Sequence, residues 1–395
     1  MGESRISTFE FASAATIRFG AGLSRSPDEY ALFRGLPVFL LTGSDPSRYE
    51  STIQAVRDVA EIVSIEQTRG EPDTVEIRRL VTAARATDAR AVMSVGGGSV
   101  IDAGKVVAAL LTNHGALFDY LEVIGSGRPI SHDPAPFVAV PTTAGTGSEV
   151  TRNAVIGSAE HGVKVSMRSK DMLPDLALVD PELCLTLPER ATVCSGLDAA
   201  TQLIEAYTSR KSNVMTDALC IEGLDHFSRG FESAVEHARS TRGDTSASEE
   251  DLKARSHMCV ASLFSGLALA NAGLGAVHGF AGPLGGMTGA PHGALCAALL
   301  AEVTRMNIDH ADQHTIERYQ RVAEIIFGPD TTYRELPDLL RLRVEQYGVD
   351  RISDLGLKPD RYAEAAEKAQ RAGSMKGNPV ICSDRQLIEV LERSA

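Results

Sequence analysis

The feature that most constrains the fold is a glycine-rich segment at residues 95–105, VGGGSVIDAGK. An apolar run at 91–95 precedes it and indicates a buried strand, and apolar residues at 106–111 continue it as a helix. The glycines therefore lie at a strand-to-helix turn, where free backbone N–H groups and the positive end of the helix dipole converge. Because glycine lets a bulky anion approach the backbone, we interpret this segment as a phosphate-binding turn rather than an ordinary tight turn.

Strand and helix patterns alternate through the first half of this 395-residue chain. Apolar runs at 36–43, 62–65, 91–95 and 137–141 indicate strands, and helical patterns at 51–60 and 73–86 separate them. Such alternation is typical of a parallel sheet covered on both faces, whose ligands bind beyond the carboxyl ends of the strands. A loose alternation at 7–25 suggests a hairpin at the edge of the sheet.

The second half has a different pattern. Beyond Pro188 the periodicity predicts helices only, including segments near 195–209, 214–234, 249–270 and 293–308. The sequence thus predicts an α/β N-terminal domain with a parallel, Rossmann-like sheet, and an all-α C-terminal domain. We place the boundary so that residues 1–185 form the dinucleotide-binding α/β domain and 186–395 form the all-helical metal and substrate domain.

A second polar segment, PTTAGTGSEVT at 141–151, follows the last predicted strand of the sheet. Its hydroxyl groups and glycines suit a ribose, a phosphate or a carboxamide, although such a loop can also satisfy its own backbone. Because it would lie at the same end of the sheet as the phosphate turn, we favour a ligand-binding role.

Charge and composition narrow the possible partners. The net charge is −13, which argues against nucleic acid or an anionic membrane as a partner. The six cysteines are scattered without a CxxC pair, and Met1 to Arg5 is not followed by the apolar core of a signal peptide, so we expect a cytoplasmic protein. No Asp, Glu, Lys or Arg lies between Arg255 and Glu302, but glycines and Pro283 interrupt this segment. We therefore interpret it as buried helices and not as a membrane span.

Four residues of the helical half are candidate metal ligands. Asp198 and Gln202 are four positions apart and share one face of a predicted helix. His278 and His292 lie in the charge-free segment, each beside a glycine. Buried histidines are often merely hydrogen-bonded. Two of them with a carboxylate, however, match the ligand set of an open ferrous site, which the oxygen of Gln202 would complete.

These motifs resemble the iron-containing (class III) alcohol dehydrogenase family. The similarity runs from about Phe19 to Pro379 and includes the GGGS turn, PTTAGTGSE and GLDA at 196–199. The two histidines fourteen positions apart also match, as do Lys164, Pro174 and DPEL at 180–183. The resemblance implies the dehydroquinate synthase-like, or iron alcohol dehydrogenase, fold. It also implies an NAD- or NADP-dependent oxidoreductase that acts on CH–OH groups.

The resemblance also implies roles for individual residues. The pyrophosphate, ribose and nicotinamide of the cofactor would be bound by Gly43, Ser44, Gly97, Gly98, Ser99, Asp102, Thr142, Thr143, Thr146, Asn153, Lys164, Glu182 and Leu183. Asp198, Gln202, His278 and His292 would hold a divalent metal, Fe²⁺ first, with Zn²⁺ or Mn²⁺ as alternatives. The catalytic residues would be Asp198, His278 and His292, with the metal polarising the oxygen of a small alcohol or aldehyde. A homodimer or a larger homo-oligomer is expected.

The chain departs from the family pattern at three positions. Gln202 stands where members usually have His, which predicts weaker metal binding, especially of zinc. Gly282 replaces a further histidine that is a candidate proton relay. Gly43 and Ser44 replace an Asp that would accept the ribose hydroxyls and repel a 2′-phosphate, so with Arg48 nearby we favour NADP.

Three alternatives remain open at this point. A reductase of the maleylacetate reductase type would keep the fold and cofactor but use no metal, and Gln202 supports this alternative. A dehydroquinate synthase would be a lyase that uses NAD transiently, although the basic groups expected for a phosphorylated sugar acid are missing. A binding protein that has lost catalysis would have no need to keep the phosphate turn together with both histidines.

Overall fold

The computed structural model describes residues 8–241 and 247–395, and contacts divide the chain into two units. The first, here called the α/β unit, comprises Ser13–Thr192 and Ala234–Cys259. The second, the helical unit, comprises Met1–Ala12, Val193–Ser233 and Val260–Ala395. Three helices cross from one unit into the other, so the domain limits inferred from the sequence, with a break after residue 185, stay a prediction.

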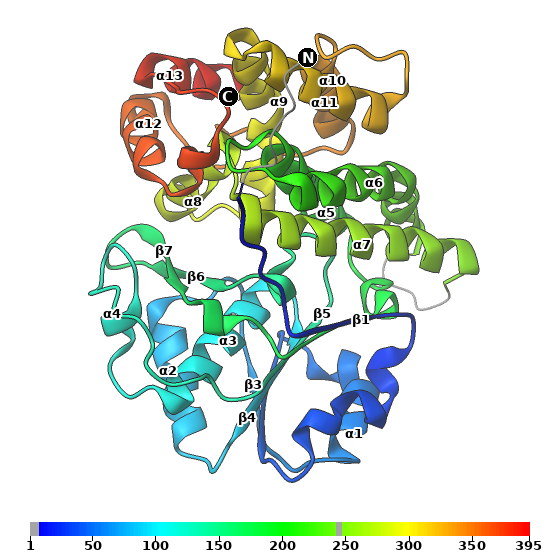
Figure 1. Ribbon diagram of the computed structural model, residues 1–395, viewed down its shortest axis with the longest axis vertical. Helices are drawn as coiled ribbons and strands as arrows, with labels where there is room; N and C mark the ends of the chain where they lie inside the picture. Colours follow the sequence, from blue (N-terminus) through cyan, green and yellow to red (C-terminus); the bar gives the residue numbers. More distant parts are fainter. Residues whose placement is uncertain (1–7, 242–246) are drawn as a thin grey trace. The chain divides into compact units, whose positions relative to one another are not determined.

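The α/β unit is built on a parallel sheet, as the sequence predicts, and this sheet has six strands (Figure 1). Its order is β1-β8-β5-β4-β2-β3. The strands are β1 (Thr16–Phe19), β2 (Val38–Thr42), β3 (Ile62–Gln67), β4 (Ala91–Gly96), β5 (Phe137–Pro141) and β8 (Leu176–Val179). The hairpin expected at residues 7–25 is wrong, because β1 pairs in parallel with the distant β8. A short alternating run does not specify which strand becomes its partner.

Side chains of alternating direction along β2 form a core on each face of the sheet. Phe39 and Leu41 pack in the cluster that includes α2 (Thr74–Arg85) and α3 (Gly98–Thr112). Val38 and Leu40 pack in a second cluster with α1 (Glu50–Arg57). Figure 1 shows α2 and α3 on one side of the sheet and α1 on the other. These two apolar layers hold the strands in place, so that the turns after them are fixed in space.

The chain leaves β2 for β3 on one side and then returns to β4 on the other side of β2. The carboxyl ends of β2 and β4 therefore flank the point where the strand order reverses. Ligands of open parallel sheets bind at such a point. The glycine-rich turn follows β4, so it lies at this end of the sheet.

The remaining elements of the α/β unit are smaller. A short helix α4 (Leu117–Tyr120) precedes β5, and an antiparallel hairpin pairs β6 (Asn153–Ser158) with β7 (Val163–Arg168). The sequence analysis did not predict this hairpin. One face of the hairpin packs on the α2–α3 side of the core, and a local pattern does not reveal this packing.

After β8, every regular element in the described part of the chain is helical, which confirms the all-α second half. The helices are α5 (Glu189–Thr208), α6 (Val214–Thr241), α7 (Glu249–Ala272), α8 (Ala276–Thr288), α9 (His292–His310), α10 (Gln313–Phe327), α11 (Leu336–Gln346), α12 (Tyr362–Arg371) and α13 (Asp384–Arg393). Within residues 8–241 and 247–395, no single helix is long and apolar enough to cross a membrane. Among the helices that the structure describes, α7 and α8 taken together meet that criterion, and they are bent by 97°.

Candidate metal centre and cofactor-binding turns

Four side chains of the helical unit converge on one point. Asp198 comes from α5, His278 from α8, and His292 and Cys296 from α9, and one ligand atom of each lies within 4.8 Å of the others. The Oδ1 atom of Asp198 lies 3.3 Å from Nε2 of His278 and 3.8 Å from Nε2 of His292. The Sγ atom of Cys296 lies 3.7 Å and 3.6 Å from the same two nitrogen atoms. This set of oxygen, nitrogen and sulfur donors could hold a divalent metal ion.

The environment of this cluster fits a cation. Asp198, His278 and Cys296 are buried, whereas a third of the His292 side chain is exposed. In the described part of the chain, Oδ1 of Asp198 has no hydrogen-bond partner. A buried carboxylate oxygen without a partner is costly, and a metal ion would satisfy it. The cluster therefore fits a divalent metal on the chemistry of its donors and on this unsatisfied oxygen.

Mutual attraction dominates the electrostatics of the cluster. Burial raises the pKa of Asp198, but the contact with His278 and the charges of His292 and His278 outweigh it, so that its pKa is lowered. Burial lowers the pKa of His278, but the charge of Cys296 and the contact with Asp198 raise it well above its usual value. The pKa of His292 is raised by Cys296 and Asp198 in the same way. These shifts describe a site that stabilises opposite charges close together.

Glu205 lies two turns after Asp198 on the same face of α5, and it orients His278. Its Oε2 lies 2.7 Å from Nδ1 of His278, and its Oε1 accepts a 2.6 Å hydrogen bond from the backbone N–H of Val277. The carboxylate thus also caps the first turn of α8, where backbone N–H groups lack helical partners. Because Nδ1 faces this carboxylate, Nε2 is the nitrogen available to a metal.

Gln202 contacts the cluster through Asp198. Its Nε2 donates a 3.2 Å hydrogen bond to Oδ2 of Asp198, and its Oε1 accepts a 2.9 Å hydrogen bond from Ser265. The structure therefore brings together all four residues that the sequence analysis named as ligands, and Gln202 contacts the carboxylate. Whether each one binds metal stays a prediction.

Sequence reasoning missed Cys296 and Glu205. Cys296 lies four residues after His292, the spacing that placed Asp198 and Gln202 on one helix face. Glu205 lies seven residues after Asp198 and therefore on the same face of α5. Helical spacing from the recognised ligands was thus the signal that could have found both.

Most of the predicted cofactor-binding residues of the α/β unit follow the carboxyl ends of parallel strands, whereas Asn153 and Lys164 lie in the β6–β7 hairpin. Gly43 follows β2, Gly97 follows β4 and Thr142 follows β5. Glu182 and Leu183 lie in a 3₁₀ turn, Pro181–Cys184, that comes after β8. Parallel strands end at the same end of the sheet, so these turns share one end.

The glycine turn and the threonine-rich loop lie against each other. A Cβ atom on Gly98 would lie 2.5 Å from Oγ1 of Thr146, and one on Gly97 would lie 3.3 Å from Cγ2 of Thr143. The first distance is too short for a contact, so any side chain at position 98 would force Thr146 to move. The start of α3 and the threonine-rich loop are therefore in close contact.

The charged members of the predicted cofactor set already have protein partners. Asp102 accepts a 2.8 Å hydrogen bond from the backbone of Val155 in β6. Lys164 forms an ion pair with Glu71, and Glu182 forms one with Arg25 at 2.7 Å. In the structure these side chains therefore tie the elements of the unit together.

A buried charge network supports the start of β6. Lys105 donates 2.8 Å hydrogen bonds to Thr151 Oγ1 and to the backbone oxygen of Asn153, and its Nζ lies 3.4 Å from Asp102. Burial raises the pKa of Asp102 and lowers that of Lys105. The charge of Lys105 partly offsets the shift of Asp102, and the charge of Asp102 partly offsets that of Lys105. Burial also raises the pKa of Glu149 to about 7, against the attraction of Lys105. The network thus carries a titratable group near neutral pH.

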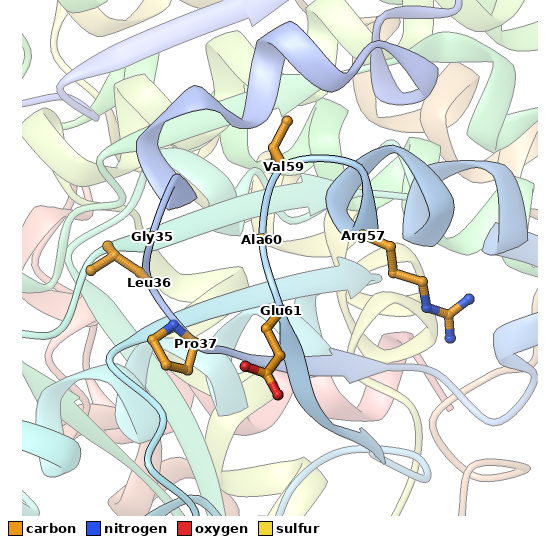
Figure 2. A pocket seen from close by; sticks show the side chains of 7 residues that line it. All are labelled: Gly35, Leu36, Pro37, Arg57, Val59, Ala60 and Glu61. Carbon is orange, nitrogen blue, oxygen red and sulfur yellow. The ribbon is translucent and has the colours of Figure 1, made fainter.

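A surface cavity of about 530 Å³ lies elsewhere in the α/β unit, lined by residues that include Pro37, Arg57 and Glu61 (Figure 2). Pro37 and Glu61 immediately precede β2 and β3. The cavity is therefore at the amino ends of these strands, opposite the glycine turn. It is not the predicted cofactor site.

The α/β unit has a parallel sheet with a glycine turn, and the helical unit gathers a carboxylate and two imidazoles that could hold a metal. Both features suit a dehydrogenase. The comparisons with known proteins agree. Residues 14–181 match the model of "Iron-containing alcohol dehydrogenase", and residues 192–395 match that of "Fe-containing alcohol dehydrogenase family, C-terminal". The chain belongs to the iron-containing alcohol dehydrogenase family, as its motifs predicted.

Individual relatives cover most of the chain. It is similar to a 1,3-propanediol dehydrogenase of Citrobacter freundii, at 31% identity over 87% of this chain and 86% of the relative. It is also similar to a 4-hydroxybutyrate dehydrogenase of Cupriavidus necator, at 35% identity over 85% of each chain. Its fold matches the solved structure of an alcohol dehydrogenase from Oenococcus oeni, with a TM-score of 0.87 and 28% identity over 98% of this chain and 100% of the other.

Proposed function

We propose that this protein is an NAD(P)-dependent alcohol dehydrogenase, or in reverse an aldehyde or ketone reductase, that holds a divalent metal in its helical unit. The observation that carries the proposal is the buried Oδ1 of Asp198, which lacks a hydrogen-bond partner among the described residues and faces two imidazole Nε2 atoms. Membership of the family supports the same activity.

Each part of the chain has a task in this reaction. The glycine turn at the start of α3 binds the pyrophosphate of the cofactor through its N–H groups. Asp198, His278 and His292 hold the metal, and Glu205 fixes the ring of His278. When bound, the metal acts as a Lewis acid that polarises the C–O bond of the substrate, while the nicotinamide donates or accepts the hydride. Gly282 carries no side chain that could relay a proton, so water or a group of the substrate or cofactor would have to take that role.

Gly43 and Arg48 favour NADP over NAD. Gly43, the residue directly after β2, carries no carboxylate to repel a 2′-phosphate, and a side chain there would meet no atom within 4 Å. The next carboxylate along the chain, that of Asp45, accepts hydrogen bonds from the backbone N–H and the hydroxyl of Ser47. The exposed guanidinium of Arg48 donates a 2.6 Å hydrogen bond to the hydroxyl of Thr186. Both residues belong to the α/β unit, which also carries Gly43. An arginine near this position can accommodate the 2′-phosphate.

We further assign a neutral, modest-sized alcohol or aldehyde as the substrate. The charge-free segment that carries His278 and His292 is rich in glycine, alanine and leucine, and Phe280 of α8 is buried within it. The relative named for 1,3-propanediol supports a short, neutral chain with a primary hydroxyl group. The relative named for 4-hydroxybutyrate supports the short chain and the primary hydroxyl group only, because 4-hydroxybutyrate is an anion. A cytoplasmic location and a homodimer or larger homo-oligomer belong to the same proposal.

The deciding experiment measures metal content and activity together. Protein purified without chelator is analysed for metal and assayed on a panel of aldehydes and ketones with NADH and NADPH, with and without Fe²⁺, Zn²⁺ and Mn²⁺. We expect stoichiometric metal and metal-dependent consumption of the reduced cofactor. Full turnover of metal-free protein would overturn the proposal in favour of the metal-independent reductase. Product formation without stoichiometric cofactor consumption would indicate a lyase.

A further inference from the structure

Cys296 lies where a metal ligand would lie. We propose that its sulfur is the fourth protein ligand of the metal, which gives an Asp198, His278, His292 and Cys296 site in place of the set that includes Gln202. This inference rests on the proposed function, because it requires that the cluster binds a metal. It concerns which atoms hold the ion, and therefore which ion the protein prefers.

The distances between the donor atoms support four ligands around one ion. Zinc binds carboxylate oxygen and imidazole nitrogen at about 2.0–2.2 Å and thiolate sulfur at about 2.3 Å. The corners of a tetrahedron with these bond lengths are separated by about 3.3–3.7 Å. The measured separations are 3.3 Å and 3.8 Å from Asp198 Oδ1 to the two imidazoles, and 3.7 Å and 3.6 Å from Cys296 Sγ to them. Four of the six donor separations thus lie close to those of a tetrahedral site, and the other two are within 4.8 Å.

The contacts of Gln202 explain why a fourth ligand comes from another helix. Its amide nitrogen is directed to Oδ2 of Asp198 and its oxygen to Ser265. With these contacts Gln202 orients the carboxylate, so that Oδ1 faces the imidazoles. The side chain that the family pattern would supply from α5 is therefore replaced by one from α9, four residues after His292.

A purely packing role would leave the sulfur of Cys296 among apolar side chains, as is usual for buried cysteine. Here the sulfur lies instead beside the Nε2 atoms of both candidate histidine ligands. Binding through sulfur releases the thiol proton to solvent, and no other bond changes. Because thiolate is a soft ligand, it favours zinc over manganese or magnesium. The protein should therefore prefer zinc more strongly than a site built from Asp198, Gln202 and two histidines would.

Cobalt absorption tests the sulfur ligand directly. The full-length protein is stripped with chelator and reloaded with Co²⁺, and its near-ultraviolet spectrum is recorded for the wild type, Cys296→Ser and Cys382→Ser. We expect a sulfur-to-cobalt charge-transfer band in the wild type and in Cys382→Ser, which alters a buried cysteine outside the cluster. Cys296→Ser should lose the band and bind Zn²⁺ roughly tenfold or more weakly, since even outer ligand partners contribute about 10–100-fold.

A second variant separates the loss of a ligand from a loss of folding. Gln202→His in the Cys296→Ser background restores a fourth strong ligand, so Zn²⁺ affinity should recover while the charge-transfer band stays absent. The sulfur ligand would be overturned if the wild type bound Co²⁺ without the charge-transfer band and Cys296→Ser bound the metal with unchanged affinity. The proposed function would still stand in that case. Failure of the wild type to bind Co²⁺ or Zn²⁺ at all would overturn both.

Discussion

The Nδ1 atom of His278 lies 2.7 Å from Oε2 of Glu205, across 73 positions of sequence. The same carboxylate accepts the backbone N–H of Val277, so it fixes both the first turn of α8 and the ring that this turn carries. When a histidine held in this way binds a metal, its Nδ1 keeps a proton that the carboxylate accepts, and Nε2 gives up its proton to become the ligand.

Glu205→Gln should therefore weaken metal binding while the fold is kept. The amide oxygen can still accept the N–H of Val277, but the amide N–H₂ then faces Nδ1 and favours the tautomer with its proton on Nε2. We expect metal affinity to fall about 10–100-fold. Competition with a chelator of known affinity measures it, with Glu302→Gln, a buried glutamate on α9, as the matched control. Equal affinity in both variants would show that Glu205 only caps α8.

Asp198→Ala and His292→Ala should each abolish turnover but leave NAD(P)H binding intact. The predicted cofactor-binding residues belong to the α/β unit, whereas both substituted residues belong to the helical unit. Metal polarisation contributes several kcal/mol, so turnover should fall roughly 10²-fold or more. Steady-state kinetics and cofactor fluorescence measure the two effects, with His310→Ala at the other end of α9 as the control. Normal turnover in either variant would refute the assigned roles.

Gly43→Asp should shift the preference from NADPH to NADH. A side chain fits at this position without a clash, and a carboxylate there would repel the 2′-phosphate and accept the ribose hydroxyls. One added repulsive contact of about 1.4 kcal/mol lowers kcat/KM for NADPH roughly tenfold relative to NADH. Gly43→Asn has the same size without the charge and should change the ratio much less. If both variants keep the wild-type ratio, position 43 does not face the ribose.

Glu149→Gln should change how stability depends on pH. Burial raises the pKa of Glu149 from its ordinary value of 4.5 to about 7, so the folded protein binds an extra proton between these pH values. The stability of the wild type therefore falls as pH rises through this window and does not fall further above it. The variant lacks this loss. The free energy of unfolding of the variant minus that of the wild type should therefore be about 3 kcal/mol larger at pH 8 than at pH 4.5.

Urea unfolding at both pH values measures this difference. Glu160→Gln, on the exposed turn between β6 and β7, is the control for the loss of a carboxylate without burial. A stability difference between Glu149→Gln and the wild type that is the same at pH 4.5 and pH 8 would mean that Glu149 titrates alike in the folded and unfolded chains.

Much of the architecture followed from local pattern. The apolar run before Gly96 and the helix after it defined the glycine turn, and the strands on either side gave the parallel sheet. Helical periodicity beyond Pro188 predicted that the second half of the chain is all helical. The pairing of β1 with β8 and the β6–β7 hairpin did not follow, because a strand's partner depends on segments far away in the chain.

The sequence alone determined which kind of chemistry is present: a turn built for an anion, and an aspartate and two histidines suited to a metal. Tertiary structure alone decided that Cys296 joins those three residues, and that Glu205 holds His278. The physical reason is that spacing along the chain places side chains on one helix face, as with His292 and Cys296. Only the packing of α5, α8 and α9 against one another brings those faces to a single point.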